Sequence, residues 1–167
     1  MDSQSSADPG AVETRVPGPD HPVLVDAMLG TLVTYLRMCG YDAAFTLERG
    51  LDEDAAIRAT ARAETRTVLT RDRELAARAD DAVLLETRET DEQLAELAAA
   101  GFELELPAEP RRCGNCNGRL APVAATETTA AYAPEPGETD VWRCRDCTRL
   151  FWRGSHWAAV AERLAGH

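Results

Sequence analysis

The hydrophobic pattern of residues 23–101 alternates between short apolar runs and longer segments with helical spacing. The runs are typical of buried strands, and four are expected, at 23–26, 43–46, 67–70 and 82–85. Between and after them, apolar or alanine-rich positions recur as on one face of a helix, at 29–40, 54–64, 72–79 and 90–101. This strand–helix alternation predicts an α/β domain with a parallel sheet flanked by helices.

The flanking segments differ from this pattern. Residues 1–20 are polar and rich in Gly, Pro and Ser, so we expect a disordered tail. Pro107 and Pro110 mark a boundary, beyond which turn-rich sequence with little helix continues to Trp157. We therefore expect three parts: a tail at 1–20, an α/β domain at 21–107, and a small module with a C-terminal helix at 108–167.

Two Cys-x-x-Cys motifs, Cys113–Cys116 and Cys144–Cys147, dominate the last part. Each short loop can place two thiolates on one ion, and two such loops close a tetrahedral structural zinc site. In so small a module the metal would supply much of the folding free energy. The alternatives are an iron–sulfur cluster or a redox dithiol, for which the sequence offers no supporting context. The fifth cysteine, Cys39, is expected to be a buried free thiol.

Acidic residues follow the expected strands. Asp26 ends the first strand, Asp72 follows the third, and Asp54 begins the helix between them. Ligands of parallel sheets collect at the carboxyl ends of the strands, where these carboxylates could bind Mg²⁺ or Mn²⁺ for phosphodiester chemistry. Each aspartate alone is more typical of a helix N-cap, and only their recurrence on adjacent strand-to-helix turns favours a metal site. Glu74 is either a fourth ligand or a first-turn charge that favours its helix dipole.

The segment Phe151–Trp157 contains two tryptophans, an arginine and a histidine. Such side chains stack on bases and contact phosphate, so Trp152, Arg153 and His156 are candidate RNA contacts, with Arg71 beside Asp72 as a fourth. The alternative is that Trp152 and Trp157 complete the core of the small module.

Charge is unevenly distributed. All 18 basic residues are arginine, against 29 acids; residues 1–109 carry a net charge of −13 and residues 110–167 carry +2. The basic C-terminal module is thus the part expected to meet an anionic partner. An acidic surface without lysine suits a halophilic, high-salt cytoplasm, although a GC-rich genome also favours arginine. We expect a cytoplasmic protein, because no segment is typical of a membrane span or a secretory signal.

These residues together resemble the Mut-seven C-terminal RNase-domain family, a branch of the PIN-like nuclease superfamily with an appended zinc ribbon. The likeness covers about residues 23–164. The matching stretches are Val25–Gly30, Leu36–Asp42, Leu69–Leu75, both cysteine motifs and Trp152–Trp157.

The resemblance implies a PIN-like α/β fold and acids that coordinate a divalent metal for RNA hydrolysis. Carried onto this sequence, the acids are Asp26, Asp54 and Asp72, with Glu74 as a further acid. The second acid lies in the run 52–54, where all three residues are acidic. We therefore predict an Mg²⁺- or Mn²⁺-dependent ribonuclease whose zinc ribbon positions RNA. The alternatives are a non-catalytic RNA-binding or ribosome-associated adaptor that uses the zinc ribbon, and a protein–protein module.

Overall fold

The computed structural model describes residues 18–167. Residues 1–17, nearly all of the tail predicted to be disordered, lie outside the described residues. The described chain begins with a turn in which the His21 N–H donates to the Gly18 carbonyl at 2.8 Å. This turn leads directly into the first strand.

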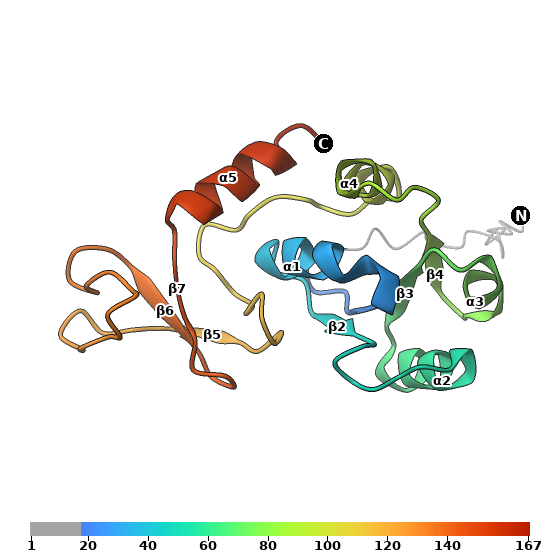
Figure 1. The fold of residues 1–167 in the computed structure, drawn as a ribbon, viewed down its shortest axis with the longest axis horizontal. Helices are drawn as coiled ribbons and strands as arrows, with labels where there is room; N and C mark the ends of the chain where they lie inside the picture. Colours follow the sequence, from blue (N-terminus) through green and yellow to red (C-terminus); the bar gives the residue numbers. More distant parts are fainter. Residues whose placement is uncertain (1–17) are drawn as a thin grey trace, which may run out of the picture.

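A four-stranded parallel sheet forms the centre of the α/β domain (Figure 1). Its strands lie close to the four predicted runs: β1 (Val23–Val25), β2 (Ala43–Phe45), β3 (Thr67–Thr70) and β4 (Ala82–Leu84). The strand order is β2-β1-β3-β4. The predicted parallel sheet is therefore confirmed, and β1 and β3 are its two central strands.

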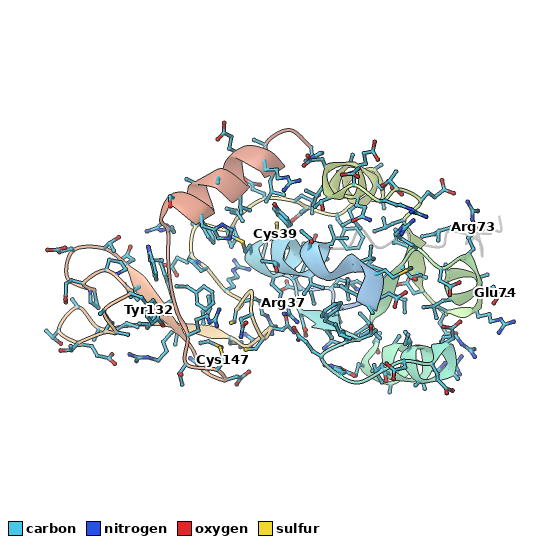
Figure 2. All side chains as sticks on the ribbon, in the orientation of Figure 1. Arg37, Cys39, Arg73, Glu74, Tyr132 and Cys147 are labelled. Carbon is cyan, nitrogen blue, oxygen red and sulfur yellow. The ribbon has the colours of Figure 1, made fainter. Side chains whose placement is uncertain are left out.

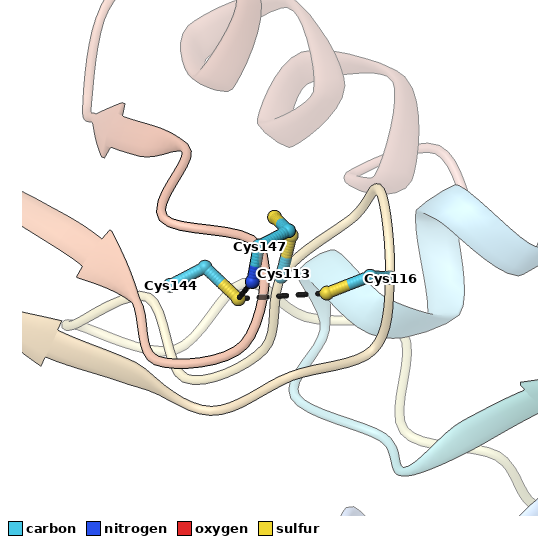
Figure 3. Close-up of side chains that lie close together, drawn as sticks. All are labelled: Cys113, Cys116, Cys144 and Cys147. Atoms are coloured by element: carbon cyan, nitrogen blue, oxygen red, sulfur yellow. Dashed lines mark hydrogen bonds between the residues drawn. The ribbon is translucent and has the colours of Figure 1, made fainter.

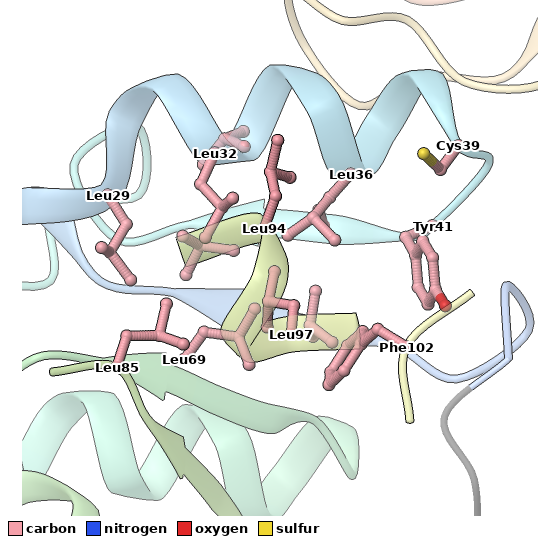
Figure 4. Packing of buried hydrophobic residues seen from close by; sticks show 14 of the residues in the cluster. Leu29, Leu32, Leu36, Cys39, Tyr41, Leu69, Leu85, Leu94, Leu97 and Phe102 are labelled. Atoms are coloured by element: carbon pink, nitrogen blue, oxygen red, sulfur yellow. The ribbon is translucent and has the colours of Figure 1, made fainter. Parts of the chain in front are cut away.

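Helices cover both faces of this sheet. They are α1 (Gly30–Met38), which follows the 3₁₀ turn η1 (Ala27–Leu29), then α2 (Asp54–Glu64), α3 (Arg73–Arg78) and α4 (Thr90–Ala99). Successive strand residues point to opposite faces. Val23 and Val25 accordingly pack with α1 and α4, whereas Leu24 packs with α2 and α3. Figure 4 shows the first of these cores, where fully buried leucines each contribute about 1.5–3 kcal/mol relative to an exposed position.

The C-terminal module contains a second, antiparallel sheet with the order β5-β6-β7. Its strands are β5 (Leu120–Pro122), β6 (Val141–Cys144) and β7 (Leu150–Trp152), and α5 (Ser155–Leu164) follows. Both cysteine motifs lie in the turns of this module. The expected architecture, an α/β sheet followed by a small cysteine-bearing ribbon, is confirmed.

Helix α5 leaves the ribbon and packs against α1 and α4 (Figure 1). Val160 and Leu164 are 4% and 3% exposed and belong to the same apolar cluster as α1. Arg163 contacts Asp91 of α4 at 2.6 Å and donates to the Tyr35 hydroxyl at 2.6 Å. The last helix therefore completes the α/β core, so that the two parts share one apolar cluster.

The first cysteine turn also docks on the α/β domain, at the edge strand β2. Asn117 accepts a hydrogen bond from the Ala43 N–H at 3.0 Å and donates to Asp42 Oδ1 at 2.8 Å. The Ala43 carbonyl accepts from Arg37 Nε at 3.0 Å. Arg37 is only 1% exposed and also forms an ion pair with Glu48 at 2.9 Å. Side chains thus satisfy both outward-facing backbone groups of Ala43 at this edge.

Every helix within residues 18–167 is too short or too polar to cross a membrane.

Candidate functional site

The four cysteines of the ribbon come together as the sequence predicts. Their sulfur atoms all lie within 4.8 Å of one another, and Cys113 and Cys144 are fully buried (Figure 3). The Cys116–Cys144 and Cys113–Cys147 sulfur separations are 3.5 Å and 3.7 Å, well beyond a disulfide bond of about 2.05 Å. Four thiols on two short turns are the donor set of a closed tetrahedral site that could hold a metal such as zinc.

The backbone approaches the cysteine sulfurs closely at Gly118. A methyl group on Gly118 would lie 2.7 Å from Cys144 Sγ. The backbone N–H groups of Asp146 and Cys147 point at the same sulfur, at 3.4 Å and 3.5 Å. Backbone donors of this kind stabilise thiolate ligands, so the turn fits a metal-bound Cys144.

The electrostatics of the thiols also fit a cation. Burial raises the pKa of Cys113 well above its usual range, so a thiolate there needs compensating positive charge. Burial also acts to raise the pKa of Cys147, but a backbone hydrogen bond from Arg149 and the other cysteines outweigh it and lower the pKa to about 7. A bound metal ion would supply the compensating charge at Cys113, and the thiol of Cys147 already favours the thiolate that a metal needs.

Two of the predicted acids lie at the carboxyl edge of the parallel sheet. Asp26 follows β1 and Asp72 follows β3. These strands are neighbours, and the chain leaves β1 toward β2 on one side before it returns to β3 on the other. Such a reversal of strand order is where open α/β sheets bind ligands.

Thr70 connects the two acids. Its hydroxyl donates to Asp26 Oδ2 at 2.7 Å and accepts from the Asp72 N–H at 3.0 Å. Thr70 is fully buried as the last residue of β3. Sequence reasoning missed this residue. A usable signal was present, because Thr70 is a polar residue that ends a buried apolar strand and stands two positions before an acid.

The same aspartates also cap helices, so that alternative is confirmed for both. Asp26 Oδ1 accepts from the Ala27 N–H at 2.8 Å, at the start of η1. Asp72 Oδ1 accepts from the N–H groups of Glu74 and Leu75 at 2.9 Å and 3.3 Å, at the start of α3. The second oxygen of Asp72 has no hydrogen-bond partner among residues 18–167. It is therefore available to a ligand.

The other two predicted acids are placed differently. Asp54 is the first residue of α2, after the N-cap Glu53, and makes no hydrogen bond or ion pair within the described chain. Glu74 is exposed in the first turn of α3 and points away from the sheet (Figure 2). Within residues 18–167, only the four cysteines form a group of three or more metal-ligating side chains within 4.8 Å. Metal binding by the acids therefore stays a prediction.

Two polar side-chain atoms at the carboxyl edge are buried without a hydrogen-bond partner in residues 18–167. They are Thr46 Oγ1, directly after β2, and Arg71 Nε, directly after β3. Buried polar atoms without a partner are uncommon and call for an explanation, such as a ligand or ordered water. Both atoms lie at the same sheet edge as Asp26.

Three side chains of the ribbon's aromatic segment border a cavity. Trp152, His156 and Trp157 line a cavity of about 450 Å³ beside Thr34 and Met38 of α1. The two tryptophans are half-buried, and His156 is exposed. These three side chains border open space where a planar group could enter.

Arg153 has internal partners. Its guanidinium contacts Asp140 at 2.8 Å, donates to the Ala108 carbonyl at 3.0 Å, and lies 5.4 Å from the centre of the Trp142 ring. These contacts hold β7 to the segment that enters the ribbon. Arg153 would have to leave them in order to contact RNA.

Comparison with known proteins adds one finding. A family model described as "Mut7-C RNAse domain" matches residues 22–164. The matched range contains the parallel sheet, the ribbon and all of the predicted site residues. Searches of curated proteins and of solved structures found no match.

Proposed function

Because the chain belongs to the Mut7-C RNAse domain family, we propose that it is a ribonuclease that hydrolyses RNA phosphodiester bonds with the help of Mg²⁺ or Mn²⁺. The observation that carries this proposal is the hydrogen-bonded series Asp26–Thr70–Asp72. It lies at the reversal of strand order, where the fold favours ligand binding. Family membership supports RNA as the substrate.

Asp26 and Asp72 would hold the divalent metal, with an acid of the run 52–54 as the third ligand. Carboxylate oxygens are the ligands that Mg²⁺ and Mn²⁺ prefer. When bound, such an ion activates water and offsets negative charge on the phosphodiester. Thr70 orients the Asp26 carboxylate, because its hydroxyl fixes one of the two oxygens at 2.7 Å.

Arg71 would bind a phosphate group of the substrate. It lies between Thr70 and Asp72 in the sequence, and its Nε is buried without a partner in residues 18–167. A phosphate oxygen would satisfy this donor, and arginine suits phosphate because its planar fork donates two parallel hydrogen bonds. Thr46 Oγ1 would similarly find a partner in the substrate or in an ordered water.

The zinc ribbon would position RNA rather than cleave it. All four cysteines are needed to fill a tetrahedral zinc shell, which leaves no open position for a substrate. The cavity beside Trp152, His156 and Trp157 suits an unpaired base, since aromatic side chains stack on bases of any sequence.

The test uses Asp26→Asn and Asp72→Asn, with Glu92→Gln as a matched control. Each change removes one carboxylate charge, and Glu92 is an exposed first-turn residue of α4. We expect RNA cleavage and Mn²⁺-induced thermal stabilisation to fall together in both aspartate variants, by orders of magnitude in rate. Without Mn²⁺, the melting temperature of Asp72→Asn should barely change, because asparagine caps helices as well as aspartate. That of Asp26→Asn should fall somewhat, because the amide nitrogen cannot accept from the Thr70 hydroxyl. The control should behave as wild type.

The second candidate function is a non-catalytic RNA-binding or ribosome-associated adaptor. The capping contacts of Asp26 and Asp72 favour it, because they give both side chains a structural role without any metal. An adaptor would bind RNA through the ribbon, show no cleavage with Mg²⁺ or Mn²⁺, and gain no stability from either ion. That result in wild-type protein would replace the nuclease proposal.

A further inference from the structure

A groove of about 720 Å³ lies between the ribbon and the amino ends of the parallel strands. This end of the sheet is opposite to the one that carries Asp26 and Asp72. Pro22 and Asp42, which precede β1 and β2, form one wall. The ribbon contributes the other wall. It presents four arginines to this groove: Arg111, Arg112, Arg119 and Arg145.

Three of these arginines lie side by side on neighbouring backbone segments. Arg112 and Arg119 are partners across an antiparallel bridge. The Arg145 N–H donates to the Arg119 carbonyl at 2.9 Å, one position beyond the Leu120–Cys144 pair of β5 and β6. Residues that face each other across antiparallel segments point to the same side, and like charges there destabilise the sheet.

The protein itself compensates little of this charge. Arg111, Arg119 and Arg145 form no ion pair with any acid of residues 18–167, and Arg112 reaches Asp42 only at 3.9 Å. Asp42 is already bound by Arg66 at 2.9 Å and by Asn117 at 2.8 Å. Two further acids, Asp20 and Glu109, border the groove. Unpaired arginines are unexpected in a chain that holds 29 acids and 18 basic residues.

We propose that this groove binds the backbone phosphates of single-stranded RNA, as a second contact away from the scissile bond. The inference rests on the proposed function, in that RNA is the ligand. Adjacent guanidinium groups suit a polyanion, because each guanidinium can bind one phosphate. Successive phosphates along the RNA would then neutralise neighbouring arginines and relieve the repulsion between them. A flexible single strand can follow a groove, whereas a rigid A-form duplex presents a convex surface.

The position of the groove has a consequence for substrate length. Pro22 and Asp42 lie at the amino ends of the strands, and Asp26 and Asp72 lie at the carboxyl ends. Strands of three to four residues with a rise of about 3.3 Å per residue separate these ends by about 10 Å or more. An RNA that contacts both must extend at least a few nucleotides from the scissile bond. The arginine groove therefore favours long RNA over short fragments.

The experiment measures binding of fluorescent oligouridylates of about four and about sixteen nucleotides, without added Mg²⁺ or Mn²⁺, across a KCl titration. The variants are Arg145→Gln and the double variant Arg119→Gln/Arg145→Gln. Arg78→Gln is the matched control, since Arg78 is exposed on α3 and has no ion pair in the described chain. For the long RNA, each lost phosphate contact should make the slope of log K against log salt less negative by about 0.7. The short RNA, which has fewer phosphates to place in the groove, should bind more weakly to wild type and show a smaller change in slope.

A second readout is independent of RNA. Removal of Arg145 relieves its repulsion with Arg119, so at low salt the melting temperature of Arg145→Gln should equal or exceed that of wild type. The proposal is overturned if the arginine variants bind long RNA with the same affinity and the same salt slope as wild type. It is also overturned if wild-type protein binds no RNA. Preference for an acidic peptide over RNA also overturns it. RNA binding that depends on these arginines, in a protein that cleaves no RNA after Mg²⁺ or Mn²⁺ is added, would contradict the nuclease proposal alone.

Discussion

The Thr70 hydroxyl donates to Asp26 Oδ2 at 2.7 Å, joining two residues that are 44 positions apart in the sequence. Each of them directly ends or follows a central strand. The register of β1 and β3, in which Val25 pairs with Leu69, sets this contact. The carboxylate orientation is therefore fixed by the sheet itself and not by a mobile loop.

The contribution of Thr70 can be separated from its packing. Thr70→Val keeps the shape but removes the hydroxyl, and it leaves Asp26 Oδ2 and the Asp72 N–H without a partner. We expect unfolding free energy to fall by about 1–3 kcal/mol. RNA cleavage should fall and the Mn²⁺ concentration needed for stabilisation should rise. Thr70→Ser, which keeps the hydroxyl, should restore the Mn²⁺ response. A Thr70→Val protein with unchanged Mn²⁺ response would assign Thr70 a purely structural role.

Zinc binding can be tested without replacing a ligand. Gly118→Ala places a methyl group 2.7 Å from Cys144 Sγ, so we expect loss of most bound zinc and of the ribbon's thermal transition. Gly114→Ala is the matched control in the same turn, because its methyl group would meet nothing closer than 3.5 Å. Elemental analysis of both, beside Cys144→Ser, is the measurement. Equal zinc content in the Gly118 and Gly114 variants, or iron in wild-type protein, would contradict the expected site.

The contact between the ribbon and the sheet should depend on pH. Burial acts to raise the pKa of Asp42, but hydrogen bonds from Arg66 and Asn117 outweigh it and hold the pKa below its ordinary value of 3.8. A carboxyl group whose pKa is lower in the folded than in the unfolded protein stabilises the fold at pH values above its unfolded-state pKa. This stabilisation is lost as the pH falls through its folded-state pKa. Asp42→Asn should therefore cost about 1.5–3 kcal/mol at pH 7.

The difference between wild type and Asp42→Asn should shrink as the pH falls below 3.8. Chemical denaturation at several pH values measures it. Asp80→Asn is the control, since Asp80 pairs with Arg62 on the exposed surface, where an ion pair contributes little. A constant difference at all pH values would show that Asp42 acts through its shape rather than its charge.

Stability should rise with salt. Residues 1–109 carry a net charge of −13, and their mutual repulsion weakens the compact state when it is unscreened. We expect the melting temperature to increase from millimolar to molar KCl as the screening length shortens to about 3 Å. Matching curves in KCl and NaCl would identify screening rather than binding of one ion. A flat or falling curve would remove the basis for a halophilic origin.

Local pattern was sufficient to predict the parallel sheet. The strand predicted at 67–70 is β3, because Thr67–Thr70 is buried at all four positions and reads as one apolar run. The cysteine cluster was equally predictable, since the spacing within each motif fixes its own turn. In both cases the signal lies within a few neighbouring residues.

Contacts across long sequence distances could not be predicted. Asn117 reads as a turn residue, and its φ of 69° fits that reading, but its partner Asp42 lies 75 positions away. The sequence predicts that Arg153 contacts RNA, because aromatic residues flank it. Its partner Asp140 lies 13 positions away, and no local pattern links the two residues. Helix α5 was assigned to the ribbon, although Val160 and Leu164 complete the α/β core.

The Asn117–Ala43 hydrogen bond has a consequence for solubility. An uncovered edge strand is a template for pairing with another chain, and here the turn that covers β2 is the turn that carries Cys113 and Cys116. Loss of the metal would release this turn and leave the Ala43 N–H free to recruit a strand from a second molecule. If a metal is bound there, its removal by a chelator should therefore lead to aggregation and not only to local unfolding, and light scattering after chelation measures this.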